Sequence, residues 1–219
     1  MKNLNTPTYW DEQFQKEYNL IKTAHHSNAG TGYRWPAMRF EALGYFTPFR
    51  GKLLDIGCGL GNFCRYMKAR NPELEIWGVD FSPKAIELAK GIEPTINYLV
   101  ADAYKLPFED NTFDVVCAQE VIEHLENPHK AIEEWKRVLK KYGELYITTP
   151  WRGSRNRELG QMFGGMMSAE HLFEWTPNEF NRNCRKHFKK VILVIPPALT
   201  DVATKETKMP YWVVAICQK

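Results

Sequence analysis

A glycine-rich turn directly after an apolar run is the segment of this sequence best suited to bind a ligand. Residues 53–62 read LLDIGCGLGN, so glycines stand at positions 57, 59 and 61. Because glycine has no side chain, such a turn lets a ligand approach the backbone closely. Asp55 precedes the glycines, and a carboxylate there repels a pyrophosphate but suits a cationic aminoacyl ligand. The alternative is an ordinary tight turn, since short glycine motifs also match by chance.

Two further carboxylates stand where later apolar runs end. Asp80 ends residues 74–80, 21 residues after Gly59, and Asp102 follows residues 96–101. A carboxylate at position 80 can accept hydrogen bonds from the hydroxyls of a ribose. A carboxylate at position 102 can accept a hydrogen bond from the exocyclic amine of adenine. Each alone is equally typical of a turn or capping aspartate. Together with the glycine turn, the two indicate a nucleoside-binding site.

The predicted secondary structure places these groups at one edge of a sheet. Apolar runs predict strands that alternate with helices, at residues 52–56, 74–80, 96–101, 113–118 and 143–149. Ser82, Asn127 and Thr176 each precede a proline and predict helix starts. Alternation implies a parallel sheet, and right-handed crossovers bring the glycine turn to its carboxyl edge. Runs at residues 190–195 and 211–217 have no helix between them, which predicts an antiparallel addition at the sheet edge.

Composition excludes several classes of protein. The net charge of +3, from 29 basic and 26 acidic residues, does not call for a nucleic-acid or membrane partner. No run approaches the roughly 18 apolar residues of a membrane span, and the first residues lack the apolar region of a signal peptide. Five cysteines without a C-x-x-C pair predict neither a disulfide framework nor a zinc ribbon. A reducing, cytoplasmic location is therefore expected.

These motifs resemble the class I S-adenosylmethionine (SAM)-dependent methyltransferases, in particular the subgroup that includes ubiquinone-pathway O-methyltransferases. The resemblance runs from residue 51 to the end and includes LLDIGCGLGN, WGVDFSPKAIELAK and VADAYKLPFEDNTFDVVCAQEVIEHLENP. It implies a Rossmann-like α/β fold, doubly wound around a mostly parallel seven-stranded sheet. The expected organisation is one domain over residues 1–219, with an N-terminal helical cover over residues 1–50 and a catalytic core over residues 51–219.

The resemblance also implies which residues bind SAM. Its methionine part would be lined by Asp55, Gly57, Cys58 and Gly59, with Gln119 contributing its backbone. Its nucleoside part would meet Asp80 at the ribose, and Phe81, Asp102 and Ala103 at the adenine.

A second group of chemistry-bearing residues follows the strand expected at residues 113–118. If a helix begins there, Glu120, Glu123 and His124 share one of its faces, and His171 arrives later in HLFEWTPNEF. Two carboxylates and two imidazoles can bind Mg²⁺ or Mn²⁺. The pattern resembles the metal site of small-RNA 3′-terminal 2′-O-methyltransferases. The alternative is a metal-free arrangement, in which the histidine packs near the cofactor and the glutamates face solvent.

The expected activity is methyl transfer from SAM to an oxygen or nitrogen of a small-molecule acceptor. His124, His171 and Glu123 are the catalytic candidates, because histidine titrates near neutral pH and can act as a general base. An anionic acceptor stays open, because three arginines follow the strand at residues 143–149, at positions 152, 155 and 157. Two other functions also stay open: metal-assisted 2′-O-methylation of an RNA terminus, and SAM binding without catalysis.

Overall fold

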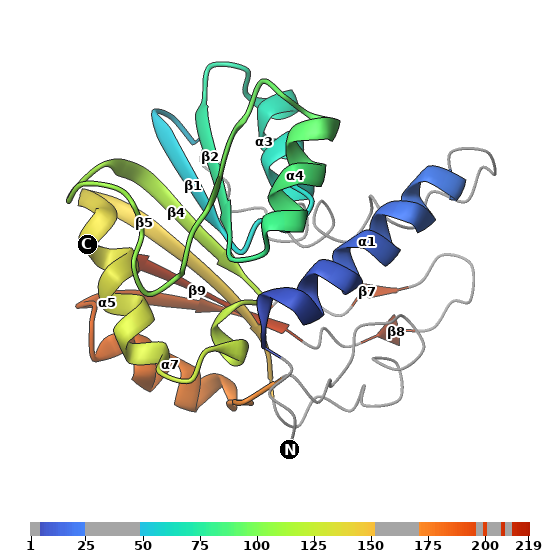
Figure 1. Cartoon of the computed structure of the whole chain (residues 1–219). Coiled ribbons are helices and arrows are strands. Elements are labelled where there is room, and N and C mark those ends of the chain that lie inside the picture. Colours follow the sequence, from blue (N-terminus) through green and yellow to red (C-terminus); the bar gives the residue numbers. More distant parts are fainter. Residues whose placement is uncertain (1–4, 25–48, 152–170, 196–198, 201–206, 209–211) are drawn as a thin grey trace.

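Seven strands form one sheet in the order β3-β2-β1-β4-β5-β9-β6 (Figure 1). This computed structural model describes residues 5–24, 49–151, 171–195, 199–200, 207–208 and 212–219. The strands of the sheet are β1 (Lys52–Ile56), β2 (Glu75–Asp80), β3 (Asn97–Val100), β4 (Phe113–Gln119), β5 (Leu139–Pro150), β6 (Lys190–Val194) and β9 (Trp212–Gln218). The expected seven-stranded, doubly wound α/β fold is therefore confirmed.

Strands β3, β2, β1, β4 and β5 run parallel, as their alternation with helices predicts. Strand β9 runs antiparallel to both β5 and β6 and lies between them. The late antiparallel pair is thus confirmed, but its second strand is inserted into the sheet and only β6 forms the edge. A separate two-stranded ribbon of β7 (Leu199–Thr200) and β8 (Thr207–Lys208) was not predicted.

Helices cover both faces of the sheet. Helices α3 (Asn62–Arg70) and α4 (Pro83–Ile92) lie on one face, and α5 (Pro128–Val138) and α7 (Pro177–Arg185) lie on the other (Figure 1). The predicted helix starts are confirmed: the Ser82 and Asn127 side chains accept from the backbone N–H three residues on, and Thr176 forms a capping box with Glu179. Each cap satisfies a backbone donor that the helix leaves unpaired.

The alternation of side chains along the strands builds one core on each face. On β1, Leu54 and Ile56 join Trp135 and Phe180 beneath α5 and α7. The intervening Leu53 joins Phe63 and other side chains beneath α3 and α4. Because both faces are covered, the central strands are apolar on both sides and their polar residues gather at the strand ends.

Helix α1 (Pro7–Ala24) lies outside these two layers and packs against α4 near the carboxyl ends of the strands (Figure 1). Residues 25–48 of the expected N-terminal helical cover lie outside the described residues. All five cysteines are unpaired thiols in buried positions. Within the described ranges, none of the helices has both the length and the apolar character that a bilayer crossing requires.

Replacing Tyr98 by phenylalanine is expected to raise the free energy of unfolding by about 1 kcal/mol. The ring is 2% exposed, and its buried hydroxyl has no hydrogen-bond partner among the described residues. Removing the hydroxyl removes an uncompensated desolvation cost. Urea unfolding of both proteins measures the difference.

The matched control for this change is Tyr146→Phe. That hydroxyl donates to Glu144 Oε2 over 2.7 Å, so its removal should be neutral or destabilising. A Tyr98→Phe variant that is less stable than wild type would contradict the expectation.

Candidate active site

The glycine turn between β1 and α3 is held against the end of β2. The backbone N–H groups of Gly57 and Cys58 donate to Val79 O over 2.8 and 3.0 Å. Gly57 and Gly59 have φ values of 69° and 50°, in the left-handed region that side chains disfavour. A Cβ at Gly57 would lie 2.4 Å from Val121 Cγ2, and one at Gly59 would lie 2.8 Å from the Phe14 ring. Neither glycine position therefore has room for a side chain.

Asp80 joins this turn to the start of α4. Its Oδ2 accepts from the Gly59 N–H, and its Oδ1 accepts from the Ser82 N–H, each over 2.9 Å. The carboxylate is 4% exposed, and burial raises its pKa to about 6 despite these two bonds. Each carboxylate oxygen has a second lone pair. Asp80 therefore retains acceptor capacity for a ligand hydroxyl.

Asp55 lies below the turn rather than on an open surface. It is 2% exposed, and burial raises its pKa to about 7, although the Cys64 thiol donates to it. The nearby Asp80 carboxylate raises the pKa further. Two buried acids thus lie under the glycine turn, which is an electrostatic environment suited to a cationic ligand group.

Replacing Asp55 by asparagine is expected to weaken the pH dependence of stability in the cofactor-free protein. In the unfolded chain the carboxyl has its ordinary pKa of 3.8, against about 7 when folded. Between these values the folded state holds a proton that the unfolded state has lost. The free energy of unfolding should therefore fall as pH rises from about 4 to about 7 and level off above that range.

Urea unfolding at pH 5 and pH 8 measures this fall in wild type and in Asp55→Asn. The exposed Asp110→Asn is the control, and it should keep the wild-type pH dependence. An equally steep fall in Asp55→Asn would contradict the assignment.

A cavity of about 590 Å³ opens at the carboxyl edge of the sheet. Helix α1 contributes Pro7, Trp10 and Phe14 to its wall, opposite the strand ends. Five of the residues predicted to bind the cofactor or nucleoside line it: Gly57, Asp80, Phe81, Asp102 and Ala103. Four others are not among its lining residues: Asp55, Cys58, Gly59 and Gln119.

Glu120 occupies a special backbone position directly after β4. Its φ of 53° is left-handed, which is uncommon for a residue with a side chain and costs conformational energy. The Thr148 carbonyl and hydroxyl accept its backbone N–H over 3.1 and 3.2 Å. The Thr148 hydroxyl in turn donates to Glu120 Oε1 over 2.9 Å. Thr148 therefore fixes both the backbone and the carboxylate of Glu120, which lines the cavity.

The helix considered for residues 120–124 does not form. The left-handed Glu120 redirects the chain, and only a short 3₁₀ turn, η1 (Ile122–His124), follows. Glu120 therefore does not share a helical face with Glu123 and His124.

Glu123, His124 and His171 nevertheless come together. One side-chain ligand atom from each lies within 4.8 Å of the other two, and the two imidazole rings are 5.0 Å apart. Glu123 is fully buried and accepts from the Thr149 hydroxyl over 3.2 Å. The backbone N–H groups of Leu172 and Phe173 donate to Glu123 O and bring the later segment to this place. Of the three, only His124 lines the cavity.

Trp10 is a cavity residue that was not among the predicted site residues. Its indole ring lies 5.3 Å from the His124 ring in an edge-to-face arrangement and borders the cavity. Asp11 anchors the same helix turn, because it accepts from the Ser82 hydroxyl and, over 3.1 Å, from the Lys84 N–H. The available signal was the spacing of Trp10 and Phe14, which places two aromatic rings on one helical face. The arginines at positions 152, 155 and 157 lie outside the described residues.

Comparisons with known proteins identify relatives of this chain. A family profile described as a methyltransferase domain matches residues 54–147. A demethylmenaquinone methyltransferase of Thermotoga maritima is 32% identical over 166 residues, which is 76% of this chain and 69% of that protein. The norajmaline N-methyltransferase of Rauvolfia serpentina is 38% identical over 110 residues, covering 47% of this chain and 37% of that one.

Solved structures show the same fold. A SAM-dependent methyltransferase of Thermotoga maritima superposes with a TM-score of 0.69 at 22% identity, over 96% of this chain and 99% of that one. A chain from the Haloferax volcanii complex of the Trm112 methyltransferase activator with its methyltransferase also gives 0.69, at 18% identity, over 92% of this chain and 96% of that one. This chain belongs to the class I SAM-dependent methyltransferases. It is accordingly an enzyme whose methyl donor is SAM.

Proposed function

We propose that this methyltransferase acts on an oxygen or nitrogen atom of a small-molecule acceptor, bound in the cavity at the carboxyl edge. The observation that carries the proposal is that one cavity of about 590 Å³ has Asp80 and Asp102 on its wall together with His124 and Glu120. The carboxylates proposed to bind the nucleoside therefore share one surface with a group able to move a proton.

Asp80, Asp102 and the residues beside them fit the nucleoside part of SAM. Asp80 has unused lone pairs on the cavity wall for the ribose hydroxyls. Asp102 offers a carboxylate acceptor to the exocyclic amine of adenine, and Ala103 lies beside it on the wall. Phe81 lies beside them, and Gly57 leaves space where a side chain would collide. Four residues outside the cavity lining are proposed to support the methionine part of SAM from behind: Asp55, Cys58, Gly59 and Gln119. SAM supplies an activated methyl group.

In the part of the cavity around His124, the protein's tasks are to orient the acceptor, exclude water and take up a proton. Trp10 on α1, whose ring lies beside His124, borders this side of the cavity. His124 is the proposed base. Glu123 and His171 lie beside it and are proposed to orient its ring. Holding the acceptor against the methyl group supplies much of the rate acceleration.

The second candidate function is metal-assisted 2′-O-methylation of an RNA terminus. The specific observation in its favour is that ligand atoms of Glu123, His124 and His171 lie within 4.8 Å of one another. Mg²⁺ or Mn²⁺ at this place would lower the pKa of a bound hydroxyl and orient it. The Glu120 carboxylate is not part of this group of three.

The test is transfer of radiolabelled methyl groups from SAM to pooled small metabolites and to short RNAs, with Mg²⁺, with Mn²⁺ and with chelator. Label in the metabolite pool, unaffected by chelator, supports the first function. Label in RNA that chelator abolishes supports the second. SAM binding by calorimetry without transfer to either pool would overturn both and leave a protein that binds SAM without catalysis.

A further inference from the structure

We propose that Asp11 is a positioning residue, which couples the docking of helix α1 over the cavity to the binding of the cofactor's ribose at Asp80. This inference rests on the proposed ribose contact and extends it to a residue of the N-terminal helix. It follows from the hydrogen bonds that join α1 to α4, from the position of Ser82 between two carboxylates, and from the place of α1 in the cavity wall.

Asp11 fastens α1 to the first turn of α4. Its Oδ1 atom accepts from the Ser82 hydroxyl and, over 3.1 Å, from the Lys84 N–H. The Lys84 N–H belongs to the first turn of α4, where an α-helix leaves its backbone donors without internal partners. A negative charge is also favoured at this end of a helix. The Asp11 carboxylate is therefore a specific attachment point between the two helices, which lie against each other (Figure 1).

Ser82 links this attachment directly to the proposed ribose carboxylate. Its hydroxyl donates to Asp11, and its side-chain oxygen accepts from the Ala85 N–H over 2.9 Å. Its backbone N–H donates to Asp80 Oδ1, also over 2.9 Å. Ser82 is fully buried, so each of these bonds is costly to leave unmade. When Asp11 is in place, Ser82 is held from both sides and in turn holds the Asp80 carboxylate.

The helix that Asp11 fastens forms part of the cavity wall. Trp10 and Phe14 both line the cavity, and their spacing of four residues places them on one face of α1. The Trp10 ring lies 5.3 Å from the His124 ring. The Phe14 ring lies against the glycine turn, where a Cβ at Gly59 would come within 2.8 Å of it. Docked α1 therefore contacts both the proposed base and the turn that precedes α3.

These contacts make ligand affinity and the docking of α1 depend on each other. A ligand bound at Asp80 meets a carboxylate that docked α1 holds in position through Asp11 and Ser82. A ligand that binds the docked state better shifts the equilibrium toward it. By linkage, docking raises the affinity by the same factor by which the ligand favours docking. Asp11 contributes to this factor because it is the group of α1 that binds Ser82.

The first measurement is the dissociation constant of S-adenosylhomocysteine for wild type, Asp11→Ala and Asp11→Asn, by calorimetry at pH 8. Asp80 is ionised at this pH, because burial raises its pKa only to about 6. Asp11→Ala should weaken binding by about tenfold, the effect of one hydrogen bond to a charged group. Asp11→Asn keeps an oxygen acceptor for Ser82 and Lys84 and should bind within about threefold of wild type.

The second measurement is hydrogen exchange of the α1 amides with and without S-adenosylhomocysteine. The ligand should slow this exchange in wild type. In Asp11→Ala the ratio of the two rates should fall by the same factor as the affinity, about tenfold, because linkage makes the two factors equal. A merely structural role of Asp11 would speed exchange equally with and without ligand, and would leave that ratio unchanged.

The matched control is Glu12→Ala, which removes the same charge at the neighbouring exposed residue of α1. Alanine is the best helix former, so α1 should form in both variants, and Glu12→Ala should keep the affinity and the exchange ratio of wild type. Wild-type affinity in Asp11→Ala would overturn the coupling. So would a loss of affinity at an unchanged exchange ratio, or an equal loss in Glu12→Ala. Failure of the proposed ribose contact has a different signature, namely wild-type affinity for S-adenosylhomocysteine in Asp80→Asn.

Discussion

Replacing His124 by glutamine is expected to lower kcat by about 100- to 1,000-fold, within the range that a general base contributes. His124 lines the cavity, whereas Glu123 and His171 lie behind it. Glutamine retains polar groups of similar reach but has no basic nitrogen, so it cannot take up the acceptor's proton. The SAM dissociation constant should stay within about twofold, because Asp80 and the glycine turn are untouched. Steady-state kinetics and calorimetry measure the two quantities.

The matched control is His129→Gln on α5. The Nδ1 atom of His129 lies 2.9 Å from His187 Nε2, and His129 does not line the cavity, so the kcat of this variant should be unchanged.

Chelator and the variant Glu123→Gln distinguish a metal-bound site from a metal-free base. Loss of activity in chelator that Mn²⁺ restores supports a bound cation, whereas indifference to chelator supports the metal-free base. Full activity in His124→Ala/His171→Ala would rule out both and leave proximity as the catalytic device.

Replacing Asp80 by asparagine is expected to weaken SAM binding by about 100-fold. The proposed ribose contact consists of two hydrogen bonds to a charged group, each contributing roughly 1.5 kcal/mol, and about 1.4 kcal/mol corresponds to a factor of ten. The amide also accepts less well from the N–H groups of Gly59 and Ser82, which now share one oxygen acceptor. Calorimetry with SAM and with S-adenosylhomocysteine measures the loss.

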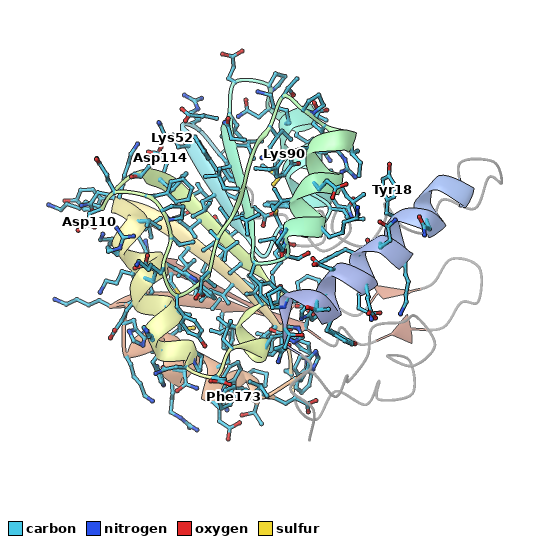
Figure 2. All side chains as sticks on the ribbon, viewed as in Figure 1. Tyr18, Lys52, Lys90, Asp110, Asp114 and Phe173 are labelled. Carbon is cyan, nitrogen blue, oxygen red and sulfur yellow. The ribbon has the colours of Figure 1, made fainter. Side chains whose placement is uncertain are left out.

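A nucleoside pair distinguishes the ribose contact from general damage to the turn. Wild type should prefer adenosine to 2′,3′-dideoxyadenosine, and Asp80→Asn should lose that preference. Asp110→Asn is the control; Figure 2 shows Asp110 on the side of the molecule away from α1, and its SAM affinity should be unchanged. A preference for adenosine that persists in Asp80→Asn, or tighter binding of NAD than of SAM to wild type, would contradict the assignment.

The sequence by itself determined the features whose signals lie within a few residues. The strand at residues 52–56, the glycine turn after it and the caps at Ser82, Asn127 and Thr176 are local, because backbone conformation and capping bonds involve neighbours in the chain. Parallel strands then place their carboxyl ends at one edge whatever their exact length. For this reason Asp80 and Asp102, predicted separately, meet at one cavity.

Only the tertiary structure decided which of the remaining groups face that cavity. The periodicity of residues 120–124 favoured one helical face, but contacts with Thr148, 28 residues away, stabilise a left-handed Glu120 and separate it from Glu123 and His124. His171 reaches His124 because Leu172 and Phe173 donate to Glu123 O. Trp10 borders the cavity because Asp11 binds the start of α4, 71 residues further along the chain. These contacts join distant segments, and their energies depend on packing and burial that no local pattern of residues encodes.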